Sequence, residues 1–122
     1  MLIRHCAGGV VFYGDSVFLL KNDKGEWVLP KGVIRDGKVA NEVALMRVRY
    51  EGGVEAQILA SVGETTYEFF SNSRKCPVHN QIQWFLMEAS SDKYSVNKME
   101  DFTDGGFFEI NEALEKVTYS QD

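Results

Sequence analysis

The first part of the chain alternates between apolar runs and turn residues. Apolar residues dominate positions 3–12, a turn at Tyr13-Gly14-Asp15 follows, and a second apolar run covers 17–20. A second turn cluster lies at 22–25, and Trp27-Val28-Leu29 is a short apolar segment that ends at Pro30, which has no N–H to donate to a sheet. We therefore predict three strands joined by tight turns.

The apolar period then changes to that of a helix. Ala40, Val43, Ala44 and Val48 recur at spacings of three and four, which places them on one face of a helix over residues 39–51. The Gly52-Gly53 pair is typical of a helix C-terminus. The residues that precede this helix, 33–38, have the composition of an ordered loop.

Strand patterns return after this helix. Long strand-like runs cover 54–70 and 78–89, with a polar hairpin loop at 71–77, a polar irregular stretch at 90–104, and a short strand at Phe107-Phe108. Asn111 is the expected N-cap of a final helix. This order predicts an α/β fold with a mixed sheet and helices on both faces, which many fold families share.

Composition narrows the class of protein. With 122 residues and 44% hydrophobic content, we expect one domain, 1–122. The net charge of -5 argues against binding to a nucleic-acid polymer. The N-terminus lacks the apolar stretch of a signal peptide or membrane span, and Cys6 and Cys76 show no pairing motif. We expect a cytoplasmic protein with two reduced, buried thiols and no membrane association.

One stretch, residues 29–54, resembles the Nudix box, whose pattern is Gly, five residues, Glu, seven residues, Arg-Glu-aliphatic-x-Glu-Glu-x-Gly-aliphatic. Gly32 and Gly53 fall in register without a gap, Val48 and Val54 occupy the aliphatic positions, and Glu51 is the last glutamate. The entry 27–32 and the ending 106–114 also resemble Nudix (MutT-like) hydrolases, so the likeness covers nearly the whole chain. It implies the Nudix fold, a mixed β-sheet sandwiched between α-helices.

The box is degenerate at the positions that carry its chemistry. In the family, three glutamates on one helix face hold Mg²⁺, which bridges a pyrophosphate and helps to activate water. The three positions here are Arg47, Tyr50 and Glu51, so one carboxylate remains. The salt-bridge pair of the box, Glu and Arg, is replaced by Lys38 and Met46. The replacement of both partners avoids an unpaired buried charge.

The resemblance implies a set of metal and catalytic residues. Glu51 is the candidate catalytic residue and, with the carbonyl of Gly32, the candidate ligand for Mg²⁺ or Mn²⁺, unless the chain uses no cofactor. Additional carboxylates from outside the three positions are further candidates: Glu42, Glu64, Glu100, Asp101 and Asp104. The alternative for each of these acids is an ordinary solvated surface position.

Each candidate ligand-binding residue also has a purely structural interpretation. Lys31 and Arg47 are expected to contact a diphosphate, although Arg47 at a helix C-terminus is also placed to cap the last turn. Tyr67 and Trp84, with Phe69, are candidates to stack on a nucleobase, but alternating aromatics also suit the core face of a strand. Tyr50 is expected to pack into the space of the metal.

Two functions therefore remain open at the level of sequence. The first is a Nudix hydrolase, weakened by the lost carboxylates, that cleaves phosphoanhydride bonds of nucleoside diphosphates linked to another moiety, dinucleoside polyphosphates included. The second is a catalytically silent Nudix domain that senses a small nucleotide or phosphorylated ligand, or binds a protein. Sequence does not predict the substrate, the oligomeric state or whether the natural chain continues past Asp122.

Overall fold

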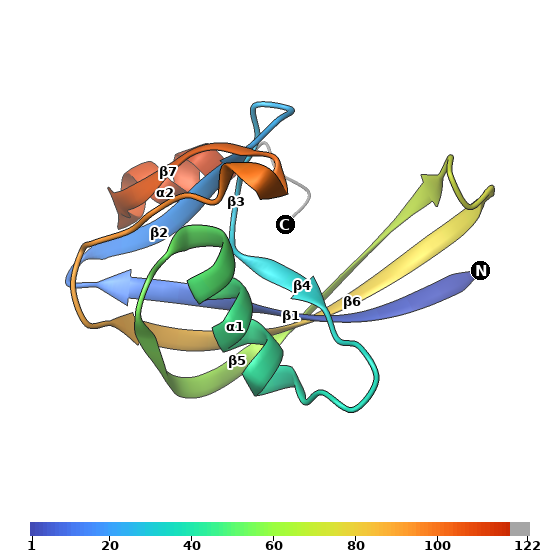
Figure 1. Ribbon diagram of the computed structural model, residues 1–122, viewed down its shortest axis with the longest axis horizontal. Helices are drawn as coiled ribbons and strands as arrows, with labels where there is room; N and C mark the ends of the chain where they lie inside the picture. The colour runs from blue at the N-terminus through green and yellow to red at the C-terminus, as the bar shows by residue number, and fades with distance from the viewer. Residues whose placement is uncertain (118–122) are drawn as a thin grey trace.

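A curled, mixed β-sheet carries one helix on each face (Figure 1). The computed structural model describes residues 1–117. In chain order the elements are β1 (Leu2–Tyr13), β2 (Ser16–Asn22), β3 (Trp27–Val28), β4 (Lys31–Val33), α1 (Ala40–Gly52), β5 (Ala56–Ser71), β6 (Cys76–Ala89), the 3-10 helix η1 (Lys98–Glu100), β7 (Phe102–Glu109) and α2 (Ile110–Val117).

The strands run in the order β3-β2-β1-β6-β5, with β4 paired to β1 and β7 paired to β2. Strands β1 and β6 are parallel in an unbroken register from Leu2↔Val78 to Phe12↔Glu88, and the other pairings are antiparallel. The mixed sheet predicted from the sequence is therefore confirmed. On one side, β1 pairs with β2 through its C-terminal residues and with β4 through residues nearer its N-terminus. Two different strands therefore flank β1 on that side, and the sheet splits between them.

Successive side chains along a strand point to opposite faces of the sheet, so alternate residues pack under α1 and under α2. In β2, Phe18 and Leu20 belong to the core under α1, whereas Val17 and Leu19 pack with Ala113 of α2. All four side chains are buried, and each buried side chain of this size contributes roughly 1.5–3 kcal/mol to folding. The period of two along the strand thus explains why helices cover both faces of the sheet.

Helix α1 is held at its C-terminus by a distant loop. Gly53 adopts a left-handed conformation with φ 63°, and its N–H donates to the carbonyl of Arg49 at 2.9 Å. The carbonyls of the three preceding residues, 50–52, accept hydrogen bonds from Asn97 Nδ2 at 3.2 Å, Asn97 N at 2.9 Å and Ser95 N at 2.8 Å. Residues 95–97 therefore complete the helix end and fix the start of η1 above it.

Strand β5 forms the outer edge of the sheet and pairs with β6 in a long hairpin that projects beside the N-terminus (Figure 1). Its register with β6 shifts at two places, between Ile58 and Ala60 and between Ser61 and Gly63. Bulges of this kind add twist and interrupt the hydrogen-bonding ladder. The inner half of this edge strand is therefore irregular.

Some predicted boundaries were wrong. The polar stretch assigned to 90–104 contains η1 and the first residues of β7, which is longer than Phe107-Phe108 because its polar residues also pair with β2. The three-residue strand β4 had no pattern long enough to detect. Asn111 is not the cap of α2, because the helix already begins at Ile110, and the Glu109 carboxylate accepts from Asn111 N at 2.7 Å.

The two cysteines differ in exposure. Neither Cys6 nor Cys76 is in a disulfide. Cys6 is buried, as expected, but Cys76, at the start of β6, is only partly buried.

Candidate functional site

Glu51, in the last turn of α1, is the one charged residue among residues 1–117 that is buried, with 3% of its surface exposed. Its Oε2 accepts a hydrogen bond from Arg47 Nε at 2.9 Å and a shorter contact from Arg47 Nη2. Its Oε1 is buried and has no hydrogen-bond partner within the described chain. The Arg47 cation therefore neutralises one oxygen of this carboxylate.

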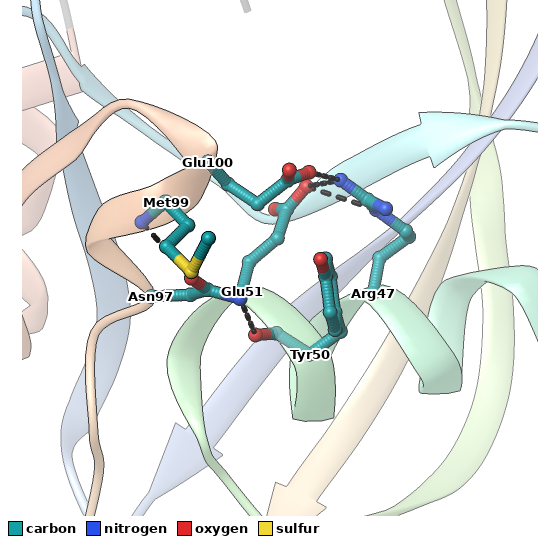
Figure 2. Close-up of polar contacts among 6 residues, drawn as sticks. All are labelled: Arg47, Tyr50, Glu51, Asn97, Met99 and Glu100. Carbon is teal, nitrogen blue, oxygen red and sulfur yellow. Dashed lines mark hydrogen bonds and ion pairs between the residues drawn. The ribbon is translucent and has the colours of Figure 1, made fainter.

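Arg47 joins two elements through its guanidinium group. Figure 2 shows it between Glu51 of α1 and Glu100 of η1, with Nη2 to Glu100 Oε1 at 3.0 Å. The guanidinium carbon also lies 5.2 Å from the centroid of the Tyr50 ring. A Cβ atom built on Gly32 would lie 2.7 Å from Arg47 Cγ and Cδ, so the side chain needs a glycine beneath it. Arg47 is thus held by two carboxylates, while residues 95–97 satisfy the helix carbonyls.

Burial dominates the ionisation of Glu51. Loss of water around the carboxylate raises the pKa of Glu51 from its ordinary 4.5 to about 7. The charge and hydrogen bonds of Arg47, and then the backbone N–H and charge of Lys31, lower the pKa by a smaller total amount. Burial by itself lowers the pKa of Arg47, but the interactions with Glu51 and Glu100 raise it by more. Arg47 therefore remains a cation.

The side chains present do not fit the family's Mg²⁺ site. A hard cation of this kind needs several oxygen ligands, usually carboxylates and water. No group of three or more His, Cys, Asp or Glu side chains gathers anywhere in residues 1–117. Glu42, Glu64, Asp101 and Asp104 are exposed, and Glu100 bonds to Arg47. A guanidinium lies on the one box carboxylate that remains, and its stem covers Gly32, the other expected ligand.

A cleft of about 440 Å³ opens beside Glu51. Its walls come from the β2–β4 segment, the end of α1, the hairpin strand β5 and the start of β7. The lining residues are Asn22, Lys24, Glu26, Val28, Leu29, Lys31, Glu51, Tyr67, Phe69 and Phe102. The rings of Tyr67 and Phe69 stack, with centroids 6.0 Å apart and an interplanar angle of 27°. We call this space the aromatic cleft.

A second cleft of about 350 Å³ lies on the Arg47 side of the same ion pair. It is lined by three basic side chains, Arg35, Lys38 and Arg47, and by one acid, Glu100. Gly32, Val33, Val43 and Met46 complete its walls. We call this space the basic cleft. Its excess of cations contrasts with the net charge of -5 for the whole chain.

The structure separates the expected ligand-binding residues. Lys31 and Tyr67 line the aromatic cleft, and Arg47 lines the basic cleft. Trp84 lines neither of them: it is 6% exposed in the core, and its Nε1 donates to Thr65 Oγ1 at 2.8 Å. Tyr50 is not a buried packing residue, because 49% of it is exposed and its ring lies against the Arg47 guanidinium.

Some site residues gave no signal in the sequence. In the sequence, Arg35 was one residue of the predicted loop 33–38, and Lys38 was the residue that replaces the glutamate of the family's salt bridge. Both line the basic cleft. Asn97 lies 47 residues from Tyr50, whose carbonyl it binds, and nothing in the local pattern indicates that contact. Lys24 and Phe102 reach the aromatic cleft from a turn and an edge strand, which only the folded chain brings together.

A family model for the NUDIX domain matches residues 3–122. The chain therefore belongs to the NUDIX family, and the resemblance inferred from the box is confirmed. Similar in sequence is a Mycobacterium tuberculosis protein named "Putative mutator protein MutT4", which is 28% identical over 96 residues. That match covers 79% of this chain and 38% of the other protein, so the chain spans about two fifths of its relative's length.

Solved structures share the fold at low identity. The E. coli dihydroneopterin triphosphate pyrophosphohydrolase superposes with a TM-score of 0.75 at 14% identity, covering 96% of this chain and 89% of that one. A C. elegans Ap4A hydrolase gives 0.74 at 16% identity, covering 97% and 88%. A NUDIX hydrolase from Nitrosomonas europaea gives 0.72 at 15%, covering 92% and 60%. At these identities the similarity shows the Nudix fold.

No helix within residues 1–117 combines the length and the apolar character needed to cross a bilayer.

Proposed function

We propose that this chain binds a small nucleotide or related phosphorylated ligand, and that metal-dependent hydrolysis of phosphoanhydride bonds is weak or lost. One observation carries the proposal: the Arg47 guanidinium forms an ion pair with Glu51, the single carboxylate that remains at the three metal-binding positions of the box. Two unit charges 4 Å apart interact by about 4 kcal/mol at an effective dielectric of 20. A dication would have to displace this cation or bind beside it.

The two clefts support a ligand with a ring at one end and phosphates at the other. The aromatic cleft offers stacked rings and apolar walls, which suit a nucleoside. The basic cleft offers Arg35, Lys38 and Arg47, whose charges suit phosphate oxygens. Lys31 and Gly32 are neighbours in β4 and line one cleft each. A nucleoside diphosphate linked to another group has the chemistry to occupy both.

A second candidate, slow hydrolysis by a rebuilt site, is favoured by the state of Glu51. Its carboxylate lines the aromatic cleft and has a pKa of about 7, which suits a general base at neutral pH. In this case Glu51 accepts the proton of a water molecule whose oxygen attacks a phosphorus atom, and the bridging P–O bond of the phosphoanhydride breaks to release the other phosphate group. The charged groups around it are Arg47 on α1, Glu100 on η1 and Lys31 on β4.

The experiment is calorimetric titration of Mg²⁺ and Mn²⁺ into the protein, alone and with ADP-ribose or diadenosine tetraphosphate, followed by a phosphate-release assay on the same samples. We expect nucleotide binding without metal and little or no turnover. Metal-dependent turnover that Glu51→Gln abolishes would establish the hydrolase instead. If neither ligand binds, the proposed function fails and a protein-binding role becomes the better explanation.

A further inference from the structure

One carboxylate, that of Glu100, lies among the cations of the basic cleft. Its Oε1 accepts a hydrogen bond from Arg47 Nη2 at 3.0 Å (Figure 2), and its side chain is 33% exposed, so solutes can reach it. Arg35 and Lys38, the other cations of the cleft, are exposed and have no acidic partner within residues 1–117. The chain thus pairs an anion of its own with Arg47, beside two cations that lack one.

The 3-10 helix η1, which carries Glu100, contributes no buried side chain. None of its three residues is buried, and Met99 is 91% exposed. The next residue, Asp101, has a left-handed backbone with φ 65°, which costs free energy for a residue with a side chain. Movement of Glu100 away from Arg47 therefore uncovers no buried side chain of η1 and allows the strained backbone beside it to relax.

The charges of the basic cleft match a phosphate group once Glu100 has left. The cleft has three basic side chains, and Glu51 neutralises one of them through its ion pair with Arg47. Two positive charges then remain, and a terminal phosphate group balances both above its second pKa of about 6. A phosphate that bridges two groups carries a single negative charge, so it gains less from the same cations.

We propose that the basic cleft takes the terminal phosphate of a nucleoside di- or triphosphate, and that Glu100 is an internal competitor that releases Arg47 when this phosphate enters. The inference rests on the proposed nucleotide-binding function and specifies its ligand. Arg47 keeps its ion pair with Glu51 throughout, and exchanges the Glu100 carboxylate for phosphate oxygens. The position of η1 then depends on whether the ligand is bound.

The first test compares ADP with its β-methyl ester, in which a methyl group caps the terminal phosphate and removes one negative charge. Binding is measured by calorimetry in EDTA at pH 8.5, where the uncapped phosphate is a dianion. We expect the unaltered protein to bind ADP about fivefold more tightly, because the additional charge meets the cations of the basic cleft. Equal binding of the two ligands would place the terminal phosphate outside this cleft and overturn the inference.

Glu100→Gln removes the competing charge and keeps the size of the side chain. We expect ADP affinity to rise about tenfold, because the phosphate no longer displaces a carboxylate from Arg47. Glu112→Gln is the matched control, since it removes the same charge from an exposed position on α2, outside both clefts. Affinity should change by less than about twofold in this control, because salt screens a distant charge. An equal rise in both variants would mean that net charge is responsible, and would overturn the role of Glu100.

A second measurement follows η1 itself. Amide hydrogen exchange of residues 98–101 is compared with and without saturating ADP, in EDTA at pH 7. We expect faster exchange with ADP, because Glu100 loses its ion pair while Asn97 still holds the start of the helix. Unchanged or slower exchange would mean that Glu100 stays on Arg47 when the nucleotide is bound, which would overturn the competition.

The outcomes separate this inference from the proposed function. ADP binding without these differences overturns the role of Glu100 and leaves nucleotide binding standing. If neither the unaltered protein nor Glu100→Gln binds ADP, both the inference and the proposed function fail. If Glu100→Gln does not fold, the two ligands and the exchange measurement on the unaltered protein still decide the question.

Discussion

The chemistry of this site depends on which charge residue 47 carries. As an arginine it neutralises Oε2 of Glu51 and reaches Glu100 across the helix end (Figure 2). As a glutamate, the residue of the family pattern, it would add a carboxylate beside Glu51. Opposite and like charges at this separation differ by several kcal/mol, which is enough to decide whether a dication binds.

Restoring the box should restore metal binding. We predict that Arg47→Glu combined with Tyr50→Glu raises Mg²⁺ affinity at least tenfold, because three carboxylates then share one helix face. Calorimetric titration of Mg²⁺ measures this change. Arg49→Glu with Tyr50→Glu is the matched control, since Arg49 pairs with Glu55 on the exposed surface instead. An unchanged Mg²⁺ affinity in the restored variant would show that the helix does not keep the family's metal geometry.

The buried carboxylate should also make stability depend on pH. The folded pKa of Glu51, about 7, lies above its ordinary 4.5, so the folded state binds the proton more tightly and loses stability as pH rises from 4.5 through 7. We predict that Glu51→Gln, which cannot ionise, gains on the order of 3 kcal/mol relative to the unaltered protein between pH 4 and pH 8.5. Urea unfolding at both pH values measures this. Parallel pH profiles for the two proteins would contradict it.

At the scale of elements, η1 belongs to the site because the residues just before it bind the last carbonyls of α1. The last carbonyls of α1 are bound by residues 95–97, and Glu100 on η1 then reaches Arg47. Asn97 acts in both directions, since Nδ2 donates to the Tyr50 carbonyl and Oδ1 accepts from Met99 N at 3.1 Å. The loop and the helix therefore hold each other in position.

Removing the Asn97 side chain should weaken this contact. We predict that Asn97→Ala lowers the free energy of unfolding by about 1 kcal/mol, because two hydrogen bonds are lost while the backbone bond to Glu51 remains. Urea denaturation provides the measurement. Asn41→Ala, at an exposed position in the first turn of α1, is the control and should change stability little. Equal effects of the two substitutions would mean that the loop does not stabilise the helix.

The sequence predicted elements well where a local pattern exists. The apolar stripe of α1 and the glycines after it placed that helix to within a residue, 39–51 against Ala40–Gly52. The framing of Gly32 and Gly53 predicted the Nudix fold. The ion pair of Arg47 with Glu51 was not predicted, although the two residues are four positions apart on α1, and the second partner of Arg47, Glu100, is 53 residues away. The contact of the Tyr50 ring with the Arg47 guanidinium also had no local pattern that predicts it.

At the scale of the whole molecule, the divided sheet creates two adjacent but different clefts. Strands β4 and β2 pair with different parts of β1, and the end of α1 lies near both, with Gly52 against Phe18 of β2 and Glu51 beside Lys31 of β4. The aromatic cleft lies on the Glu51 side of the ion pair and the basic cleft on the Arg47 side. Because the chain as a whole is acidic, the basic cleft is a local region of positive charge that attracts anions.

Charge removal in the basic cleft should therefore weaken phosphate binding. We predict that Arg35→Ala with Lys38→Ala lowers affinity for ADP-ribose about three- to tenfold and flattens its dependence on salt. Calorimetry at two ionic strengths measures both effects. Arg74→Ala with Lys93→Ala removes the same charge from exposed positions outside both clefts. If this control weakens binding equally, overall charge and not the cleft is responsible.

The ion pair between Arg47 and Glu51 also bears on how such a site can change by descent. A single change of Arg47 to glutamate brings two acids together in a desolvated place, and a single loss of Glu51 leaves the guanidinium with Glu100 as its one remaining carboxylate among the described residues. Each residue thus makes replacement of the other harmful. A chain that holds this pair cannot easily gain the three carboxylates of the family pattern one substitution at a time, because the intermediate steps each leave a buried charge poorly matched.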